Sequence, residues 1–153
     1  MKRALSILAW TCAAWLAPTI GATQDAPVKK AGSVTVDVLG VDNAKGQLLV
    51  ALFRDARGFP DRGVQAWGKR VAKPHKGDVR VVFDGVPPGP YAVSVHHDED
   101  ADFKMDFNLL GMPTEGYGFS RDAHGSFGPP SFEASRELLK PGTWQRLFIH
   151  LRY

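Results

Sequence analysis

Cysteine is almost absent from this sequence. The single cysteine among 153 residues, Cys12, lies inside an apolar run near the N-terminus. Most small exported domains rely on disulfides. A single cysteine cannot form a disulfide within the chain, and Cys12 lies in a segment that we expect to be cleaved from the exported protein. A disulfide-stabilised scaffold is therefore excluded. We therefore expect a hydrophobic core to hold the folded part together, and about 130 residues are enough to bury one core in a single domain.

Long hydrophobic runs are also lacking. The longest apolar stretch extends from Leu5 to Leu16, whereas a membrane-spanning helix needs roughly 20 apolar residues. Lys2 and Arg3 precede this stretch and small residues up to Ala22 follow it, which is the layout of a secretory signal peptide. We predict a signal peptide over residues 1–22, export to the periplasm or the cell exterior, and no membrane span after cleavage. An uncleaved anchor is the alternative.

Neither sign of charge is in large excess. The chain carries 19 Lys and Arg against 16 Asp and Glu, a formal net charge of +3, and loss of Lys2 and Arg3 would leave 17 basic against 16 acidic side chains. Proteins that bind nucleic acid need a strongly basic face. We therefore expect no nucleic acid among the partners.

Alternating apolar residues are what the sequence does contain. Residues 23–32 are polar and indicate a flexible lead-in, followed by a single domain over residues 33–153. Several runs have the period of two that is typical of half-buried strands: Val34–Val38, Val79–Phe83, Tyr91–Val95 and Leu147–Leu151. Gln47–Arg54 is apolar in both alternate sets, as in a central strand covered on both faces.

Short strands with Pro/Gly turns and little helix predict an all-β fold. We expect an immunoglobulin-like or transthyretin-like β-sandwich with Greek-key connections. Val64, Trp67 and Val71 stand at helical spacing, so a short helix or an irregular loop fits that part. From about Asp98 to Phe132 no period is visible, and a loop of that length inside a compact domain is usually functional or disordered.

Aromatic side chains in this long loop argue against disorder. They are Tyr117, Phe119, Phe127 and Phe132. They could form a platform for a sugar or a peptide, or they could pack over one end of the core. We favour packing, because buried aromatics dominate the core energetics of small domains.

An acidic loop over residues 96–108, HHDEDADFKMDFN, is the most informative segment. Carboxylates at loop positions 1, 3, 5 and 9, with a backbone carbonyl at position 7, supply the oxygen ligands that Ca²⁺ prefers. The predicted ligands are Asp98, Asp100, Asp102, the Lys104 carbonyl and Asp106. Glu115 can complete the shell if the turn at residues 111–113 returns the chain toward the loop.

The match to a helix–loop–helix calcium motif is partial, since Phe103 and Leu109 stand where that motif has Gly and Glu. A calcium loop on a β-scaffold and a solvated acidic turn with Lys104 as counterion both fit. His96 and His97 precede the loop, so a mixed His/Asp zinc site is a further alternative. The strand alternation points His97 inward, where a hydrogen bond inside the end of the sandwich is the simpler prediction.

Three consecutive motifs carry a family resemblance. They are Pro-Gly-x-Tyr-Ala at Pro88–Ala92, the acidic loop at His97–Asp106, and Gly-x-Pro-x-Glu-Gly-Tyr-Gly-Phe-Ser at Gly111–Ser120. Together they resemble the bacterial family called domain of unknown function 2141. The resemblance covers most of the chain after the leader, and it implies an exported bacterial β-sandwich without an established activity.

The acidic loop departs from the pattern of that family. Phe103 stands where the family has Gly, and a left-handed backbone there would strain Phe by on the order of 1 kcal/mol. Asp100 and Asp102 stand where the family has Asn. The added negative charge offsets some of the cation affinity that the strain would remove.

Two functions fit the sequence. One is a non-enzymatic calcium-binding module for an envelope glycan or protein, and the other is a purely structural envelope protein without a metal. A metal-dependent enzyme is a third, more distant reading. Ser120, His97 and Asp98 could be combined into a hydrolase triad, but Ser120 lies in no nucleophile elbow and adjacent strand residues point apart. We therefore expect a binding protein and not an enzyme.

Overall fold

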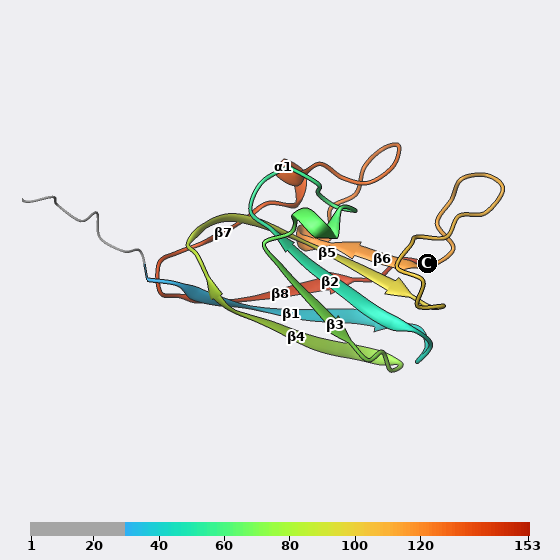
Figure 1. Cartoon of the computed structure of the whole chain (residues 1–153), viewed down its shortest axis with the longest axis horizontal. Coiled ribbons are helices and arrows are strands. Elements are labelled where there is room, and N and C mark those ends of the chain that lie inside the picture. Colours follow the sequence, from blue (N-terminus) through green and yellow to red (C-terminus); the bar gives the residue numbers. More distant parts are fainter. Residues whose placement is uncertain (1–29) are drawn as a thin grey trace, which may run out of the picture.

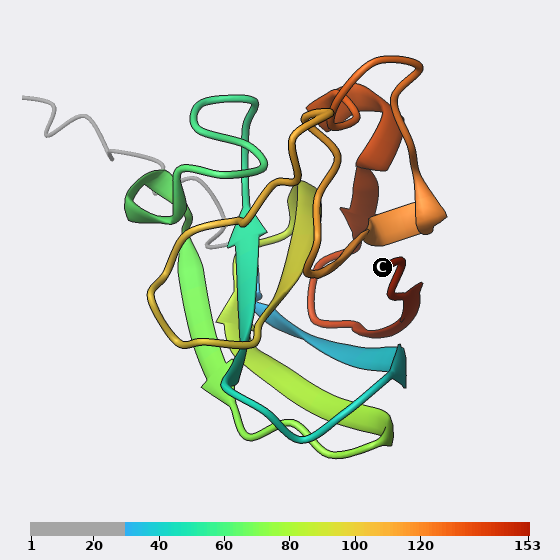
Figure 2. The ribbon, with the colours of Figure 1, turned by 90° about the vertical axis from the view of Figure 1, so that its right-hand side faces the viewer.

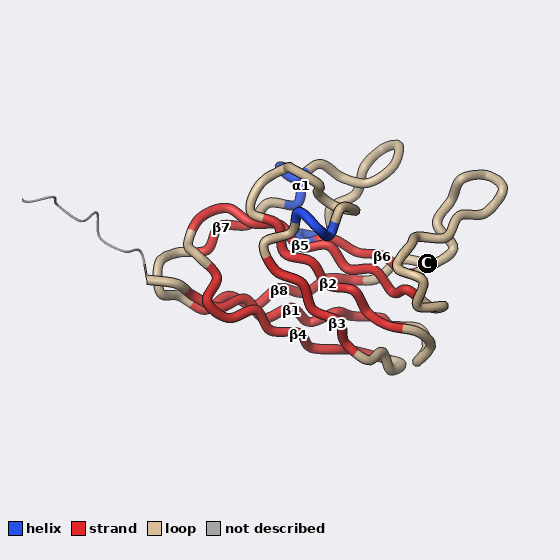
Figure 3. Tube along the Cα trace, viewed as in Figure 1, coloured by secondary structure: helices blue, strands red, loops and turns tan. Residues whose placement is uncertain are grey.

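The computed structural model describes residues 30–153, so the predicted signal peptide and most of the lead-in lie outside the described residues. Strands dominate the described part, and helix is limited to the single turn α1 (Phe132–Ser135) and two 3-10 turns (Figure 3). Within residues 30–153, no helix has the length and apolarity to cross a membrane. The all-β prediction is confirmed. The immunoglobulin-like or transthyretin-like class and the Greek-key connections stay predictions.

The strands form two sheets (Figure 1). The first sheet has the order β4 (Gly77–Val86), β1 (Gly32–Val41) and β8 (Trp144–His150). The second has the order β3 (Gly68–Ala72), β2 (Gln47–Phe53), β5 (Gly89–Asp98) and β6 (Gly116–Phe119), with β7 (Glu137–Leu139) also paired to β5. β1 and β8 run parallel, and the other strand pairs are antiparallel.

One core of apolar side chains fills the space between the two sheets. Val36 of β1, Phe83 of β4 and Ile149 of β8 meet Leu48 of β2 and Val93 of β5 in a single buried cluster. All of them except Leu48 belong to an alternating run, so the period of two correctly marked the inward face. Full burial of such side chains stabilises by about 1.5–3 kcal/mol each, which explains how the described domain folds without a disulfide.

A smaller cluster covers the outer face of the second sheet near the end of β2. Phe53, Ala92 and Phe132 are buried there, and Phe59 packs edge-to-face against Phe53 and Phe132 with ring centroids 5.4 and 5.9 Å apart. Leu52 faces the main core while its neighbour Phe53 faces this cluster. The prediction of a central strand covered on both faces is therefore confirmed at this end of β2.

The segment with helical spacing contains only the 3-10 turn Gly63–Gln65, after which the chain enters β3. Val64 is exposed, and Val71 pairs with Leu49 of β2. The short helix considered for this segment is therefore wrong. The helical spacing of Val64, Trp67 and Val71 does not mark a helix here. It arises because a turn and a short edge strand follow each other within a few residues.

Candidate functional site

The acidic loop connects β5 to β6 at one end of the sandwich. Asp98 is the last residue of β5 and Gly116 is the first residue of β6. Figure 2 looks onto the end of the molecule at which this loop lies. Because β5 is a central strand and its end is fixed by pairing with β2, the start of the loop is held at a defined place.

Three carboxylates of the loop come together. One side-chain oxygen each of Asp98, Asp100 and Asp102 lies within 4.8 Å of the others, with Asp98 buried and the other two exposed. This is the first half of the predicted ligand set. Like charges this close repel each other. Partial desolvation, together with the negative charges of Asp102 and Asp106, raises the pKa of Asp100 above its ordinary value.

Asp98 fastens the base of the loop. Its Oδ2 accepts hydrogen bonds from Gln47 Nε2 (2.7 Å) and from the backbone N–H of Phe103 (3.0 Å), and its Oδ1 accepts one from the N–H of Asp102 (3.1 Å). Burial alone would raise the pKa of Asp98, but these donors and the charge of His96 outweigh it and lower the pKa. Oδ1 keeps one lone pair for a further partner, since a carboxylate oxygen accepts two hydrogen bonds.

Two short-range contacts shape the exposed part of the loop. Asp100 Oδ1 accepts from the N–H of Asp102 at 3.2 Å, and Asp102 Oδ1 accepts from the N–H of Lys104 at 2.7 Å. The Lys104 ammonium lies 3.7 Å from the Asp102 carboxylate, so it offsets part of the local negative charge. The structure thus gives the Lys104 side chain the counterion position, while ligation by its carbonyl stays a prediction.

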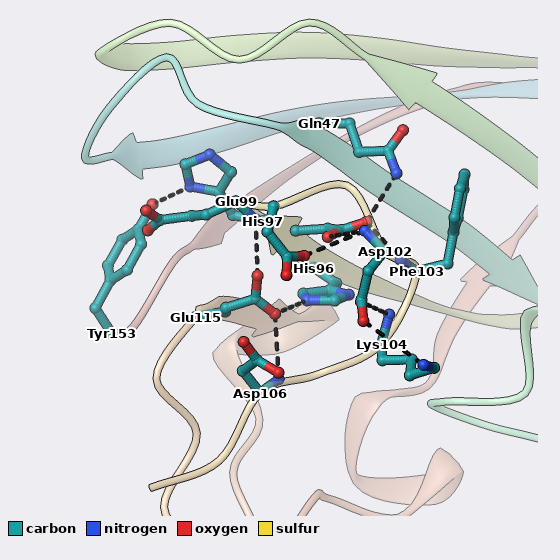
Figure 4. Close-up of polar contacts among 12 residues, drawn as sticks. Gln47, His96, His97, Glu99, Asp102, Phe103, Lys104, Asp106, Glu115 and Tyr153 are labelled. Carbon is teal, nitrogen blue, oxygen red and sulfur yellow. Dashed lines mark hydrogen bonds and ion pairs between the residues drawn. The ribbon is translucent and has the colours of Figure 1, made fainter.

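Glu115 is not one of the three carboxylates that come together, and it points toward His96 and Asp106 (Figure 4). The side chain is buried, with Oε1 accepting from the N–H of Glu99 (2.7 Å) and Oε2 accepting from the N–H of Asp106 (3.3 Å). Oε2 also pairs with His96 Nε2 at 2.7 Å. Glu115 thereby ties both ends of the acidic stretch to β5, a role that spacing alone did not reveal.

His97 is fully buried at the end of β5. Its Nε2 lies 3.0 Å from the carbonyl oxygen of Lys45, and its Nδ1 lies 2.7 Å from the hydroxyl of Tyr153. The carbonyl can only accept, so Nε2 donates to it, and Nδ1 shares a hydrogen bond with the tyrosine hydroxyl. The predicted hydrogen bonding inside the sandwich is confirmed, and both ring nitrogens are already occupied by protein groups.

The backbone of Phe103 is left-handed, with φ = 67°. This is the conformation in which we expected a Phe to be strained. Its side chain is 67% exposed, so little burial is lost when it is removed. We expect Phe103→Gly to raise the free energy of unfolding by about 0.5–1 kcal/mol, because Gly adopts this conformation without strain but adds some unfolded-state entropy. Chemical denaturation with circular dichroism measures this change.

Phe107 provides the control for that substitution. It is exposed to a similar degree, but its φ is not positive. Phe107→Gly should therefore be neutral or destabilising. A Phe103→Gly protein that is no more stable than the Phe107→Gly protein would show that the left-handed backbone costs little at this position.

The four aromatics of the long loop have different environments. Phe119 and Phe132 are buried, as the packing hypothesis predicted, and Tyr117 is partly buried beside Phe119. Phe127 is fully exposed, which packing did not predict. Ser120 is buried too, with its Oγ donating to the carbonyl of Ser135 (2.6 Å) and accepting from the N–H of Val93 (2.9 Å), so its hydroxyl has a structural partner on each side.

The comparisons with known proteins show the family of the chain. The model of a bacterial family described as "uncharacterized protein conserved in bacteria (DUF2141)" matches residues 36–144. This chain belongs to that family. The match extends from β1 to the start of β8 and includes the whole acidic loop. No curated protein and no solved structure matches the chain.

The third motif, Gly111–Ser120, has a structural explanation in this chain. A Cβ at Gly116 would lie 2.6 Å from the ring of Tyr153, and one at Gly118 would lie 2.7 Å from Ile149 Cγ2. Glu115 fastens the loop, and Ser120 hydrogen-bonds to β5. The motif therefore returns the loop to the sheet and seats β6 closely against the C-terminal segment.

Proposed function

We propose that this DUF2141 protein is an exported, non-enzymatic binding module whose acidic loop holds one calcium ion. The observation that carries the proposal is the convergence of Asp98, Asp100 and Asp102 within 4.8 Å. Export rests on the leader-like N-terminus. Calcium is the cation of choice because the converging donors are all carboxylate oxygens, the hard ligands that Ca²⁺ and Mg²⁺ take and softer transition metals do not prefer.

The proposed site is open and only partly built by the protein. Three carboxylates supply three to six of the six to eight oxygens that Ca²⁺ takes, so backbone carbonyls and water supply the others. Two of the three carboxylates are exposed, and the Lys104 ammonium competes for one of them. These features favour weak binding, with a Kd of about 10⁻⁴–10⁻³ M, the range of extracellular calcium modules.

Calcium titration with a melting-temperature readout tests the proposal. Binding to the folded state alone stabilises it by about 2.7 kcal/mol at a hundredfold excess over Kd, which raises the melting temperature of a domain of this size by several degrees. Asp100→Asn combined with Asp102→Asn should remove most of this shift. Asparagine keeps the two oxygen acceptors that shape the loop but removes the charge that attracts the cation.

A matched variant controls for the change in net charge. Asp61→Asn combined with Asp84→Asn alters two exposed aspartates outside the loop and should leave the calcium shift intact. Magnesium should shift the melting temperature less, because it requires a tighter octahedron and loses water reluctantly. If tens of millimolar calcium leaves the melting temperature of the wild-type protein unchanged, the loop holds no calcium and the proposal is wrong.

The second candidate, a structural envelope protein without a metal, also has an observation in its favour. Asp98 and Glu115 each accept three polar contacts from the loop and its neighbours. A loop that is stabilised by its own carboxylates needs no cation to keep its shape. The same titration separates the two candidates, since this one predicts no calcium shift in any variant.

A further inference from the structure

The acidic loop continues into an apolar tip, residues 107–113, which projects beyond the sheets (Figure 1). Four large apolar side chains of the tip face solvent: Phe107 (61% exposed), Leu109 (106%), Leu110 (87%) and Met112 (59%). The eight residues between Asp106 and Glu115 carry no charge. Scattered single apolar side chains are normal on protein surfaces, but a contiguous exposed group of this kind indicates an interaction site.

Four backbone N–H groups of the tip have acceptors within the loop, those of Asn108, Leu110, Gly111 and Met112. Phe107 bridges to Pro113 across the tip, and the N–H of Asn108 donates to the carbonyl of Met112 at 2.9 Å. The Asn108 side chain accepts from the N–H of Leu110 (2.9 Å) and of Met112 (3.1 Å). Internal pairing of these groups lowers the cost of placing the tip at the edge of an apolar medium, because an unpaired group there costs several kcal/mol.

The carboxylates lie at the base of the same loop. Asp106 adjoins the tip directly in the sequence, and its backbone N–H donates to Glu115 Oε2 at 3.3 Å. Phe103, also well exposed, adjoins Asp102. The loop therefore combines an exposed apolar tip with an acidic base.

We propose that this loop docks on an anionic phospholipid surface, with the apolar tip in the headgroup–acyl boundary and the calcium ion bridging Asp100 and Asp102 to lipid phosphates. The inference rests on the proposed calcium site. Without the cation, the carboxylates repel anionic headgroups, and with it the charges become complementary. A membrane suits the convex, projecting tip better than a protein does, because a fluid layer closes around side chains that would otherwise need a matching pocket.

Sedimentation with lipid vesicles tests the inference. Vesicles of phosphatidylglycerol and phosphatidylcholine in equal parts should bind the protein with millimolar calcium and release it with a chelator, and vesicles of phosphatidylcholine alone should bind it at least tenfold more weakly. Leu109→Asp combined with Leu110→Asp should weaken binding at least tenfold, since each exposed leucine loses its transfer into the bilayer. Both side chains are exposed, so the fold should be unaffected.

Matched variants separate the inference from its premise. Val64→Asp combined with Leu138→Asp places the same charges at exposed apolar positions outside the loop. This control should bind vesicles like the wild type. All variants keep the same N-terminal segment, so that segment cannot cause a difference between them. The calcium-induced melting shift, measured without vesicles, should persist in Leu109→Asp/Leu110→Asp and be lost in Asp100→Asn/Asp102→Asn.

Several outcomes would overturn the inference. A normal calcium shift without vesicle binding, or vesicle binding that survives Leu109→Asp/Leu110→Asp, refutes membrane docking by the tip and leaves the calcium site standing. Equal binding to both vesicle types without calcium refutes the cation bridge. Absence of the calcium shift in the wild-type protein refutes the proposed function itself, whatever the vesicles show.

Discussion

Replacement of Gly46 by alanine is expected to lower the free energy of unfolding by about 2–5 kcal/mol. Gly46 lies in the turn before β2 with φ = 57°, and a Cβ there would overlap the carbonyl oxygen of Asp98 and lie 2.6 Å from the carbonyl carbon of Glu99. Left-handed strain contributes about 1–2 kcal/mol, and the overlap with rigid backbone adds about 1–3 kcal/mol. Urea denaturation measures the loss.

The consequences of Gly46→Ala should extend to the acidic loop. The backbone that must move carries Asp98 and the N–H that Glu99 donates to Glu115, so we expect the calcium shift to weaken along with stability. Gly40→Ala is the matched control. Gly40 also has a positive φ, 72°, but nothing lies within 4 Å of an added Cβ, so only the strain remains. Equal losses in the two variants would show that the contact between the turn and the loop is unimportant.

Glu115→Ala is expected to cost about 2–4 kcal/mol and to release the loop over residues 99–114. The substitution leaves two backbone N–H groups and the ring of His96 without their acceptor, and hydrogen bonds to a charged group contribute about 1.5–3 kcal/mol each, part of which water recovers. Limited proteolysis should cut within the loop before the domain unfolds. Urea denaturation gives the change in global stability.

Two other substitutions define the role of Glu115. Glu133→Ala removes an exposed carboxylate paired with Arg136 and should change stability by no more than about 0.5 kcal/mol. Glu115→Gln keeps an oxygen acceptor and should lose less stability than Glu115→Ala while retaining most of the calcium shift. Loss of the calcium shift in Glu115→Gln with stability preserved would instead make Glu115 a cation ligand, as its position in the sequence first suggested.

Local patterns in the sequence determined the main strands and the family. The alternation in Val34–Val38 and Val79–Phe83 needs only the geometry of a strand with one buried face, and the structure buries the expected residues. The acidic spacing likewise brought Asp98, Asp100 and Asp102 together. Short elements such as β6 and β7 were not predicted, because three or four residues rich in Gly or lying beside a turn show no measurable period.

Only the tertiary structure decided which acidic residues hold the loop and which face solvent. Asp98 is an anchor because β2 brings Gln47 beside it across 51 residues, and His97 is occupied because Tyr153 reaches it across 56. Glu115 became an internal support because β6 pairs with β5 and returns it to His96. Spacing in the sequence describes a single loop. The hydrogen-bond and charge partners that decide whether a carboxylate is held or left in solvent come from strands that meet only when the sheets form.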